Sequence, residues 1–184
     1  ASRFKCRLTG AFFYSSKLPA YMVEDAITPM SREVLAGFLN EQVAAIEVAS
    51  SAARDVFTAN LGGNKIVTRW LDVDAETDGQ FVATAKRHDL VILPTEMQPA
   101  FSSRAISAAR IGMATGGPVL ILKQGGYPVP FGKKVLIAWK DSREAMRAIR
   151  DAWPILETAE DIHFLSVSPD APSELDGLMM RLFQ

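Results

Sequence analysis

The chain has 184 residues, of which 48% are hydrophobic and 22% are charged. This balance is that of a globular protein with enough apolar side chains for a sizeable core, in one domain or slightly more. Lys and Arg number 20 and Asp and Glu number 21, so the net charge is -1, which leaves no basic excess for a phosphate backbone and excludes nucleic acid as the expected partner.

Six short apolar runs predict buried strands. They are Arg7 to Tyr14, Lys65 to Leu71, Leu90 to Leu93, Pro118 to Leu122, Val135 to Trp139 and Ile162 to Val167. The third and fourth runs are apolar almost throughout instead of alternating with polar residues. This pattern is typical of strands that are covered on both faces of a parallel sheet.

Segments of helical period separate these strands. After Thr28 and Pro29, which make a good N-cap and first turn, apolar residues predict one long amphipathic helix that ends near Asn60. Further helices are expected from about Ala75 to Arg87, from Ser102 to Ala114, from Ser142 with a kink or break near Trp153 caused by Pro154, and from near Pro172 onward. The alternation predicts an α/β fold with a parallel sheet and helices on both faces.

A segment rich in Gly and Pro, Gln124 to Lys133, separates two strands and is the natural linker. Leu8 to Phe12 and Phe164 to Ser168 form a faint repeat, because a loop and a helix follow each of them. We therefore predict a first domain at residues 1–124 that lacks its opening strand and helix, a linker at 125–133, and a truncated second domain at 134–184.

Nothing in the sequence predicts export or membrane insertion. No apolar run approaches the ~20 residues that span a bilayer, and Ala1 to Thr9 do not follow the pattern of a secretory signal. Cys6 is the one cysteine and cannot form an internal disulfide, which fits a reducing compartment. We expect a soluble, cytoplasmic protein with no membrane partner.

The run Val135 to Ala145 passes from an apolar strand through a short Lys-Asp-Ser turn into an Ala-rich helix. It resembles the opening strand, turn and helix of universal stress protein domains, and the Pro118-Val119 start resembles the last strand of that family. The resemblance extends over essentially the whole chain. It implies a doubly wound parallel sheet of strand order 3-2-1-4-5, with a nucleotide site at the carboxyl ends of strands 1 and 4.

Many members of the family bind ATP there, through a glycine pattern after strand 4 that ends in Gly with Ser or Thr. This chain departs from that pattern, because residues 94–104 contain no glycine and two prolines that lack a backbone donor. Ser102, Ser103 and Arg104 are candidates for holding an anion at a helix start. The alternative is that the serines cap the helix and Arg104 is solvated.

A second candidate site is the turn formed by Lys140, Asp141 and Ser142, which follows the carboxyl end of a strand. In the family an acidic residue near this turn commonly faces the adenine or ribose, and Lys140 or, with a shift of one residue, Asp141 matches it. The alternative is a capped, charged surface turn.

Other polar groups do not form a recognisable site. His88 and His163 have no Cys or Glu at ligand spacing, so no metal site is expected. The carboxylates of Asp72, Asp74 and Glu76 are interpreted as charge at the start of a helix. No nucleophile elbow or Walker loop occurs, so no catalytic residue is assigned.

The sequence therefore predicts a universal stress protein that is not an enzyme and that binds or signals in the stress response. It should self-associate, as a dimer or a tandem pair, through the edge strand formed by Val119, Leu120, Ile121 and Leu122. One alternative is an ATP-binding switch with slow hydrolysis that uses the turn at Asp141. The other is an unrelated doubly wound enzyme that uses a nucleotide or a flavin.

Overall fold

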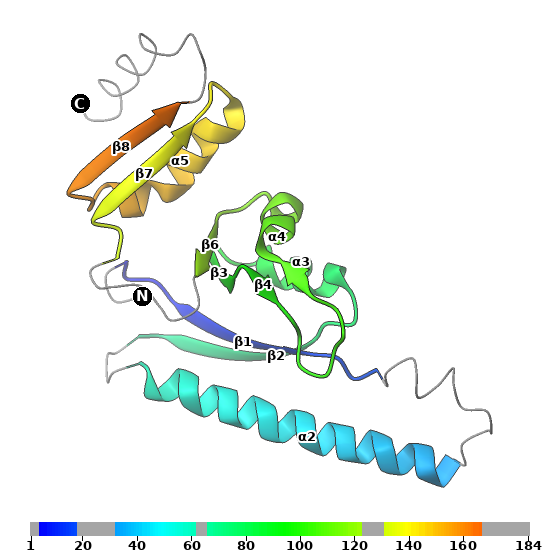
Figure 1. The fold of residues 1–184 in the computed structure, drawn as a ribbon. Helices are drawn as coiled ribbons and strands as arrows, with labels where there is room; N and C mark the ends of the chain where they lie inside the picture. The colour runs from blue at the N-terminus through cyan, green and yellow to red at the C-terminus, as the bar shows by residue number, and fades with distance from the viewer. Residues whose placement is uncertain (1–3, 18–31, 62–65, 123–130, 167–184) are drawn as a thin grey trace. The chain divides into compact units, whose positions relative to one another are not determined.

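The structure, a computed structural model, describes residues 4–17, 32–61, 66–122 and 131–166 (Figure 1). The chain divides into two compact units, Ala1–Leu122 and Lys123–Gln184. The expected helix start at Thr28 and Pro29, most of the expected linker and the expected last helix near Pro172 lie outside the described residues.

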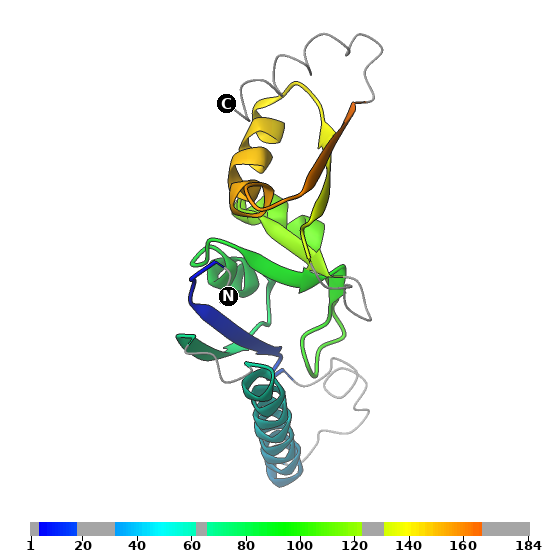
Figure 2. The same cartoon turned by 90° about the vertical axis from the view of Figure 1, so that its left-hand side faces the viewer.

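The first unit opens with two parallel strands that are joined through a long helix. Strand β1 (Leu8–Tyr14) pairs with β2 (Thr68–Asp74), and helix α2 (Arg32–Ala59) lies between them in the sequence. Figures 1 and 2 both show α2 along one face of this strand pair. The end of α2 agrees with the prediction, whereas β2 lies three residues further along the chain than the apolar run indicated.

The indole ring of Trp70 on β2 lies against Gly10 of β1 and contacts α2. Gly10 lies opposite Trp70 in the register of β1 and β2. A Cβ atom added at Gly10 would lie 2.6 Å from Cε3 of Trp70, so the indole covers the bare backbone of the neighbouring strand. The indole also meets Phe57 of α2, at a ring-centroid distance of 5.5 Å. Glycine is required here for space, because a side chain would occupy the volume of the ring.

The remaining elements of the first unit are shorter. Helix α3 (Asp78–Ala85) follows Thr77, and strand β3 (Val91–Pro94) pairs in parallel with β6 (Val119–Leu122). Between them lie the short antiparallel strands β4 (Glu96–Met97) and β5 (Ile106–Ser107) and helix α4 (Ala108–Thr115). Gly116 ends α4 with a φ of 63°, the left-handed conformation that favours glycine after a helix.

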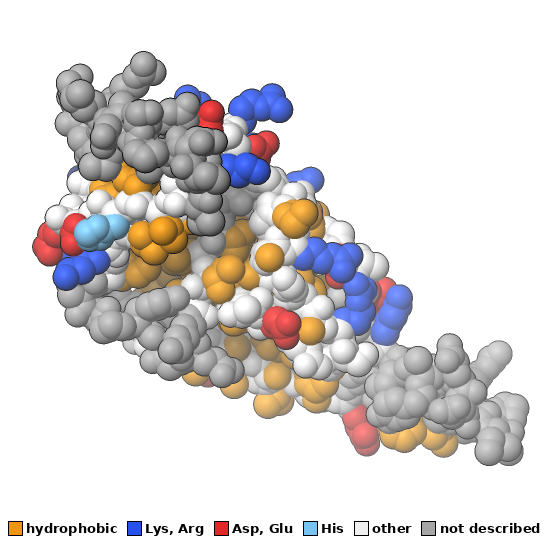
Figure 3. All heavy atoms as spheres, turned by 45° about the horizontal axis from the view of Figure 1, so that its top comes forward, with side chains coloured by type: hydrophobic (Ala, Val, Ile, Leu, Met, Phe, Trp, Pro, Cys, Tyr) orange, Lys and Arg blue, Asp and Glu red, His pale blue; other side chains and the backbone are white. Residues whose placement is uncertain are grey.

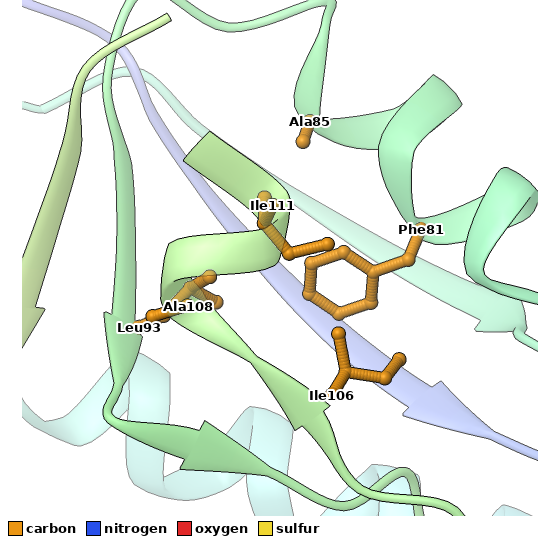
Figure 4. Close-up of a cluster of buried hydrophobic side chains, with 6 residues drawn as sticks. All are labelled: Phe81, Ala85, Leu93, Ile106, Ala108 and Ile111. Carbon is orange, nitrogen blue, oxygen red and sulfur yellow. The ribbon is translucent and has the colours of Figure 1, made fainter. Parts of the chain in front are cut away.

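The core of this unit lies among α3, α4 and the strands beside them. Figure 4 shows the buried side chains, which are Phe81, Ala85, Leu93, Ile106, Ala108 and Ile111. Phe13 of β1 stacks on Phe81 of α3, with ring centroids 4.1 Å apart. Because side chains alternate along a strand, β1 turns Phe13 toward this core and turns Gly10 and Tyr14 toward α2. The β1–β2 pair is thus covered on both faces.

The second unit is one strand–helix–strand unit. Strand β7 (Lys134–Trp139) pairs in parallel with β8 (Asp161–Ser166), and helix α5 (Arg143–Leu156) connects them. Its buried core is Trp139, Ile149 and Leu156. The expected division of this helix is wrong, because α5 continues through Pro154 to Leu156. Pro154 lies in the last turn, where it removes one backbone hydrogen bond close to the point at which the helix ends anyway.

The prediction of a mixed α/β fold is confirmed, and the part of the chain that the structure describes holds three parallel strand pairs, each connected through a helix. Among the described residues every sheet has two strands. Hydrophobic side chains also reach the surface between polar ones (Figure 3), and those of Val48 and Val56 on α2 are 71% and 64% exposed. No helix in the described part of the chain is long and apolar enough to cross a membrane.

Candidate functional site

A cleft of about 380 Å³ lies between α2 and the β1–β2 pair, and we call it the α2 cleft. The helix and the strands both contribute to its lining, which combines aromatic, aliphatic, polar and charged groups. Its lining residues are Tyr14, Ile46, Glu47, Ser50, Ser51, Arg54, Trp70 and Asp72. Of these, Ile46 is buried, whereas Glu47 and Arg54 are exposed.

A hydrogen-bond network fixes the middle of the α2 cleft. The Oδ1 atom of Asp72 accepts hydrogen bonds from the hydroxyl of Ser50 and from Nε1 of Trp70, the latter at 3.2 Å. The same indole nitrogen lies 3.4 Å from Oγ of Ser50. This network connects α2 to β2 and sets the orientation of the indole. Because a carboxylate accepts up to about four hydrogen bonds, Asp72 retains acceptor capacity for a further donor.

A second polar network follows where β1 ends. The carboxylate of Asp74 accepts hydrogen bonds from the backbone N–H of Ser16, at 3.3 Å, and from its hydroxyl. From α2, Nε2 of Gln42 donates to the carbonyls of Ser15 and Lys17, at 3.0 and 3.3 Å. The loop after β1 is therefore tied to both β2 and α2 beside the α2 cleft.

The electrostatic environment of Tyr14 is negative, because Asp72 and Asp74 lie nearby. Burial raises the pKa of the Tyr14 phenol above its usual 10.0, and the negative charges of Asp74 and Asp72 raise it further. Each carboxylate opposes the formation of a second negative charge nearby. Tyr14 is therefore a neutral hydrogen-bonding group at physiological pH, and this end of the α2 cleft favours a cation.

The interpretation of Asp72, Asp74 and Glu76 as helix-start charge is wrong for the first two. Asp72 and Asp74 lie within β2, and α3 begins only at Asp78 after Thr77. The alternation of Trp70, Asp72 and Asp74 with two apolar residues was a signal of a strand with one polar face. The sequence did not predict the α2 cleft, because Ser50, whose hydroxyl bonds to Asp72, looks like an ordinary residue of a helix.

The loop between residues 94 and 104 does not have the predicted helix start. Helix α4 begins at Ala108, so Ser102 and Ser103 do not cap it. Instead the hydroxyl of Ser102 accepts a hydrogen bond from the backbone N–H of Arg104 at 3.2 Å. The preceding Phe101 has a φ of 61°. A local turn thus replaces the first turn of the expected helix, since serine hydroxyls readily bond to a backbone N–H two residues on.

The alternative, a solvated Arg104, holds only in part, because its side chain is 52% exposed but also paired. Its Nη2 atom forms an ion pair with Asp78 at 2.6 Å, and its Nη1 atom donates to the carbonyl of Glu76 at 3.1 Å. Arg110 pairs with the second carboxylate oxygen of Asp78 at 2.8 Å. The positive charge of Arg104 is therefore compensated by the start of α3, and less of it remains for an anion.

The turn at Lys140, Asp141 and Ser142 lies in the second unit, between β7 and α5. The predicted N-cap is confirmed, because the hydroxyl of Ser142 accepts a hydrogen bond from the backbone N–H of Ala145 at 3.1 Å. Lys140 and Asp141 are exposed. The two predicted groups of site residues belong to different units, since Ser102 and Ser103 lie in the first.

Comparison with known proteins identifies no relative. The chain matches no family model, no curated protein and no solved structure. Within the described ranges, no three His, Cys, Asp or Glu side chains are grouped so that they could hold a metal ion.

Proposed function

We propose that this chain is a non-enzymatic binding and signalling protein of the universal stress protein type. The observation that carries the proposal is the pattern of strand pairing. In the order 3-2-1-4-5, strands 3 and 2, strands 1 and 2, and strands 4 and 5 are neighbours. Three observed pairs are parallel, namely β2–β1, β7–β8 and β3–β6. The proposal takes them, in that order, as the family's neighbouring strands 3 and 2, 1 and 2, and 4 and 5.

This correspondence uses the order of elements as well as the pairing. In the first unit, β1, β2, β3 and β6 would be strands 2, 3, 4 and 5. In the second unit, β7 and β8 would be strands 1 and 2, connected by α5 in the way that strand–helix–strand crossovers are built. Under this proposal each unit, taken by itself, has strands of the same doubly wound type of fold.

We further propose that the loop between residues 94 and 104 does not hold a triphosphate. Phosphate oxygens require several converging N–H groups or uncompensated cations. Here the prolines lack an N–H, and Arg104 is paired with Asp78. The protein would therefore act through a bound partner or another ligand, and not through ATP hydrolysis.

Isothermal titration calorimetry of the chain with MgATP tests this step. We expect no binding at micromolar nucleotide. Micromolar affinity that disappears in Ser102→Ala/Ser103→Ala would show that the loop does cradle phosphate. Affinity that survives this double change but disappears in Asp141→Asn would favour the ATP-binding switch, in which the turn before α5 contacts the nucleotide.

Self-association through β6 is the second part of the proposal. The strand is short and apolar, and its Ile121 and Leu122 side chains are 40% and 37% exposed. An apolar edge strand that carries no charged side chain lacks one of the features that prevent pairing with a second copy, and a symmetric dimer is the commonest closed arrangement. We propose that two chains associate along Val119–Leu122.

Light scattering with Ile121→Lys tests the dimer, and circular dichroism establishes whether the variant folds. The matched control is Met113→Lys, because Met113 on α4 is 88% exposed and lies outside the strand. We expect a dimer for the wild type and for the control, and a folded monomer for Ile121→Lys. A wild-type chain that is monomeric at high micromolar concentration would contradict the proposal.

A further inference from the structure

The α2 cleft has the size and the mixed lining of a small-molecule site. Its volume of about 380 Å³ lies at the lower end of the range of ligand pockets, about 300–1,000 Å³. A cleft of this volume fits a small metabolite better than a dinucleotide. Ile46, Tyr14 and Trp70 provide apolar and aromatic surface, while the polar groups lie around them.

The charges of the α2 cleft are separated along the helix. Glu47 and Arg54 are seven residues apart on α2, so they lie on the same face about 10.5 Å apart along the axis. Within the ranges that the structure describes, neither side chain has an ion-pair partner. A negative and a positive group at opposite ends are thus free to bind ligand charges of the opposite sign.

The strands add a further carboxylate in the middle of the α2 cleft. Asp72 contributes a second carboxylate to the lining and keeps acceptor capacity beyond its bonds to Ser50 and Trp70. An ammonium group can donate three hydrogen bonds, and Asp72 and Tyr14 each offer an oxygen. At the opposite end, the guanidinium of Arg54 matches a carboxylate, which it binds through two parallel hydrogen bonds.

We propose that the α2 cleft binds an extended zwitterion of the ω-amino acid class. The ammonium group lies at Glu47 and Asp72, the carboxylate lies at Arg54, and the methylene chain packs on Trp70. An α-amino acid carries both charges on one carbon and is too short to reach both ends of the cleft. This proposal stands apart from the family assignment, since it rests only on α2, β1 and β2.

The test is an NMR titration of the 15N-labelled full chain with 6-aminohexanoate. The indole N–H signal of Trp70, identified by its loss in Trp70→Phe, reports on the α2 cleft because that nitrogen bonds to Asp72. A ligand with nine heavy atoms should saturate the signal with a dissociation constant of about 1 mM. Hexylamine and hexanoate, which each carry one of the two charges, should bind about tenfold more weakly.

Glu47→Gln and Arg54→Gln should each lower the affinity for 6-aminohexanoate about tenfold. Both side chains are exposed, so the variants should keep the wild-type spectrum outside the α2 cleft. Glu41→Gln is the matched control, since it removes an exposed carboxylate of the same helix outside the lining. The proposal is overturned if the indole signal does not saturate at tens of millimolar, if hexylamine binds equally well, or if the control weakens binding as much as Glu47→Gln.

Discussion

The contact between Gly10 and Trp70 makes a sharp prediction about stability. In Gly10→Ala the new methyl carbon would lie 2.6 and 2.7 Å from Cε3 and Cζ3 of the Trp70 indole and 3.1 Å from Cδ2 of Phe57. Carbon atoms prefer a separation of about 3.5–4.0 Å, so the ring must move by about 1 Å. Such movement is resisted, because the indole nitrogen bonds to Asp72 and the ring packs against α2.

The magnitude follows from two opposing effects. Inserting a methyl group into packed surroundings costs about 1–3 kcal/mol. Replacing glycine by alanine lowers the conformational entropy of the unfolded chain, which stabilises the folded protein by about 0.4–1 kcal/mol. The midpoints of the two ranges give a net decrease of about 1.3 kcal/mol in the free energy of unfolding of Gly10→Ala. Urea unfolding followed by circular dichroism measures this difference, and the slope with urea should be unchanged if the same surface is exposed.

The matched control is Gly37→Ala in α2. An added Cβ at Gly37 has no atom within 4 Å, so only the backbone effect remains. In a helix interior this change should stabilise the protein by up to about 1 kcal/mol. The two variants should thus shift stability in opposite directions. If Gly10→Ala is as stable as the wild type while Gly37→Ala behaves as expected, the steric reasoning at Trp70 is refuted.

Three further predictions concern ionisation and hydrogen bonding. Burial and the neighbouring carboxylates raise the pKa of Tyr14, so the unfolded chain loses the phenol proton at a lower pH than the folded chain. The free energy of unfolding should therefore fall as the pH rises above 10. Urea titrations at increasing pH measure this fall, and Tyr14→Phe should remove the part that is due to the phenol. Ser142→Ala should lower stability by about 1 kcal/mol through the lost N-cap, and Ser142→Asp should restore it in the same assay. Asp78→Asn should destabilise the first unit less in high salt than in low salt, because its ion pair with Arg104 is partly exposed; an equal loss in both salts would contradict this.

Much of the fold could be predicted from short-range pattern alone. Apolar runs of four to eight residues located the main strands to within a few residues. The burial on both faces that two of these runs indicated is not seen in the described residues, because Ile92 of β3 and Ile121 of β6 are 47% and 40% exposed. The two short strands β4 and β5, which pair with each other, were not predicted. Each has two residues, and a pairing that short leaves no periodic signal. Because the apolar run ends three residues before β2 does, the carboxylates of Asp72 and Asp74 were interpreted as charge at the start of the next helix.

The candidate site could not be predicted in the same way, because its polar contacts join residues that are distant in the sequence. The hydroxyl of Ser50 meets Asp72 across 22 positions, and Gln42 reaches the carbonyl of Ser15 across 27. In the sequence Ser50 stands in a run of small residues on a helix, where a serine usually faces solvent. Only the packing of α2 on the strand pair turns these side chains toward one another.

Arg104 shows how a distant contact also decides between functions. From the sequence alone, two serines and an arginine after a strand form a reasonable anion site. The argument changes once Asp78, 26 residues earlier, is seen to bind the guanidinium. An anion at this loop would have to compete with a carboxylate already paired to two arginines, Arg104 and Arg110, and it would find no glycine backbone to compensate. The same interaction that anchors the loop to α3 therefore weakens the case for a phosphate site there. It directs attention to the α2 cleft, where the side chains of Glu47 and Arg54 have no ion-pair partner among the described residues.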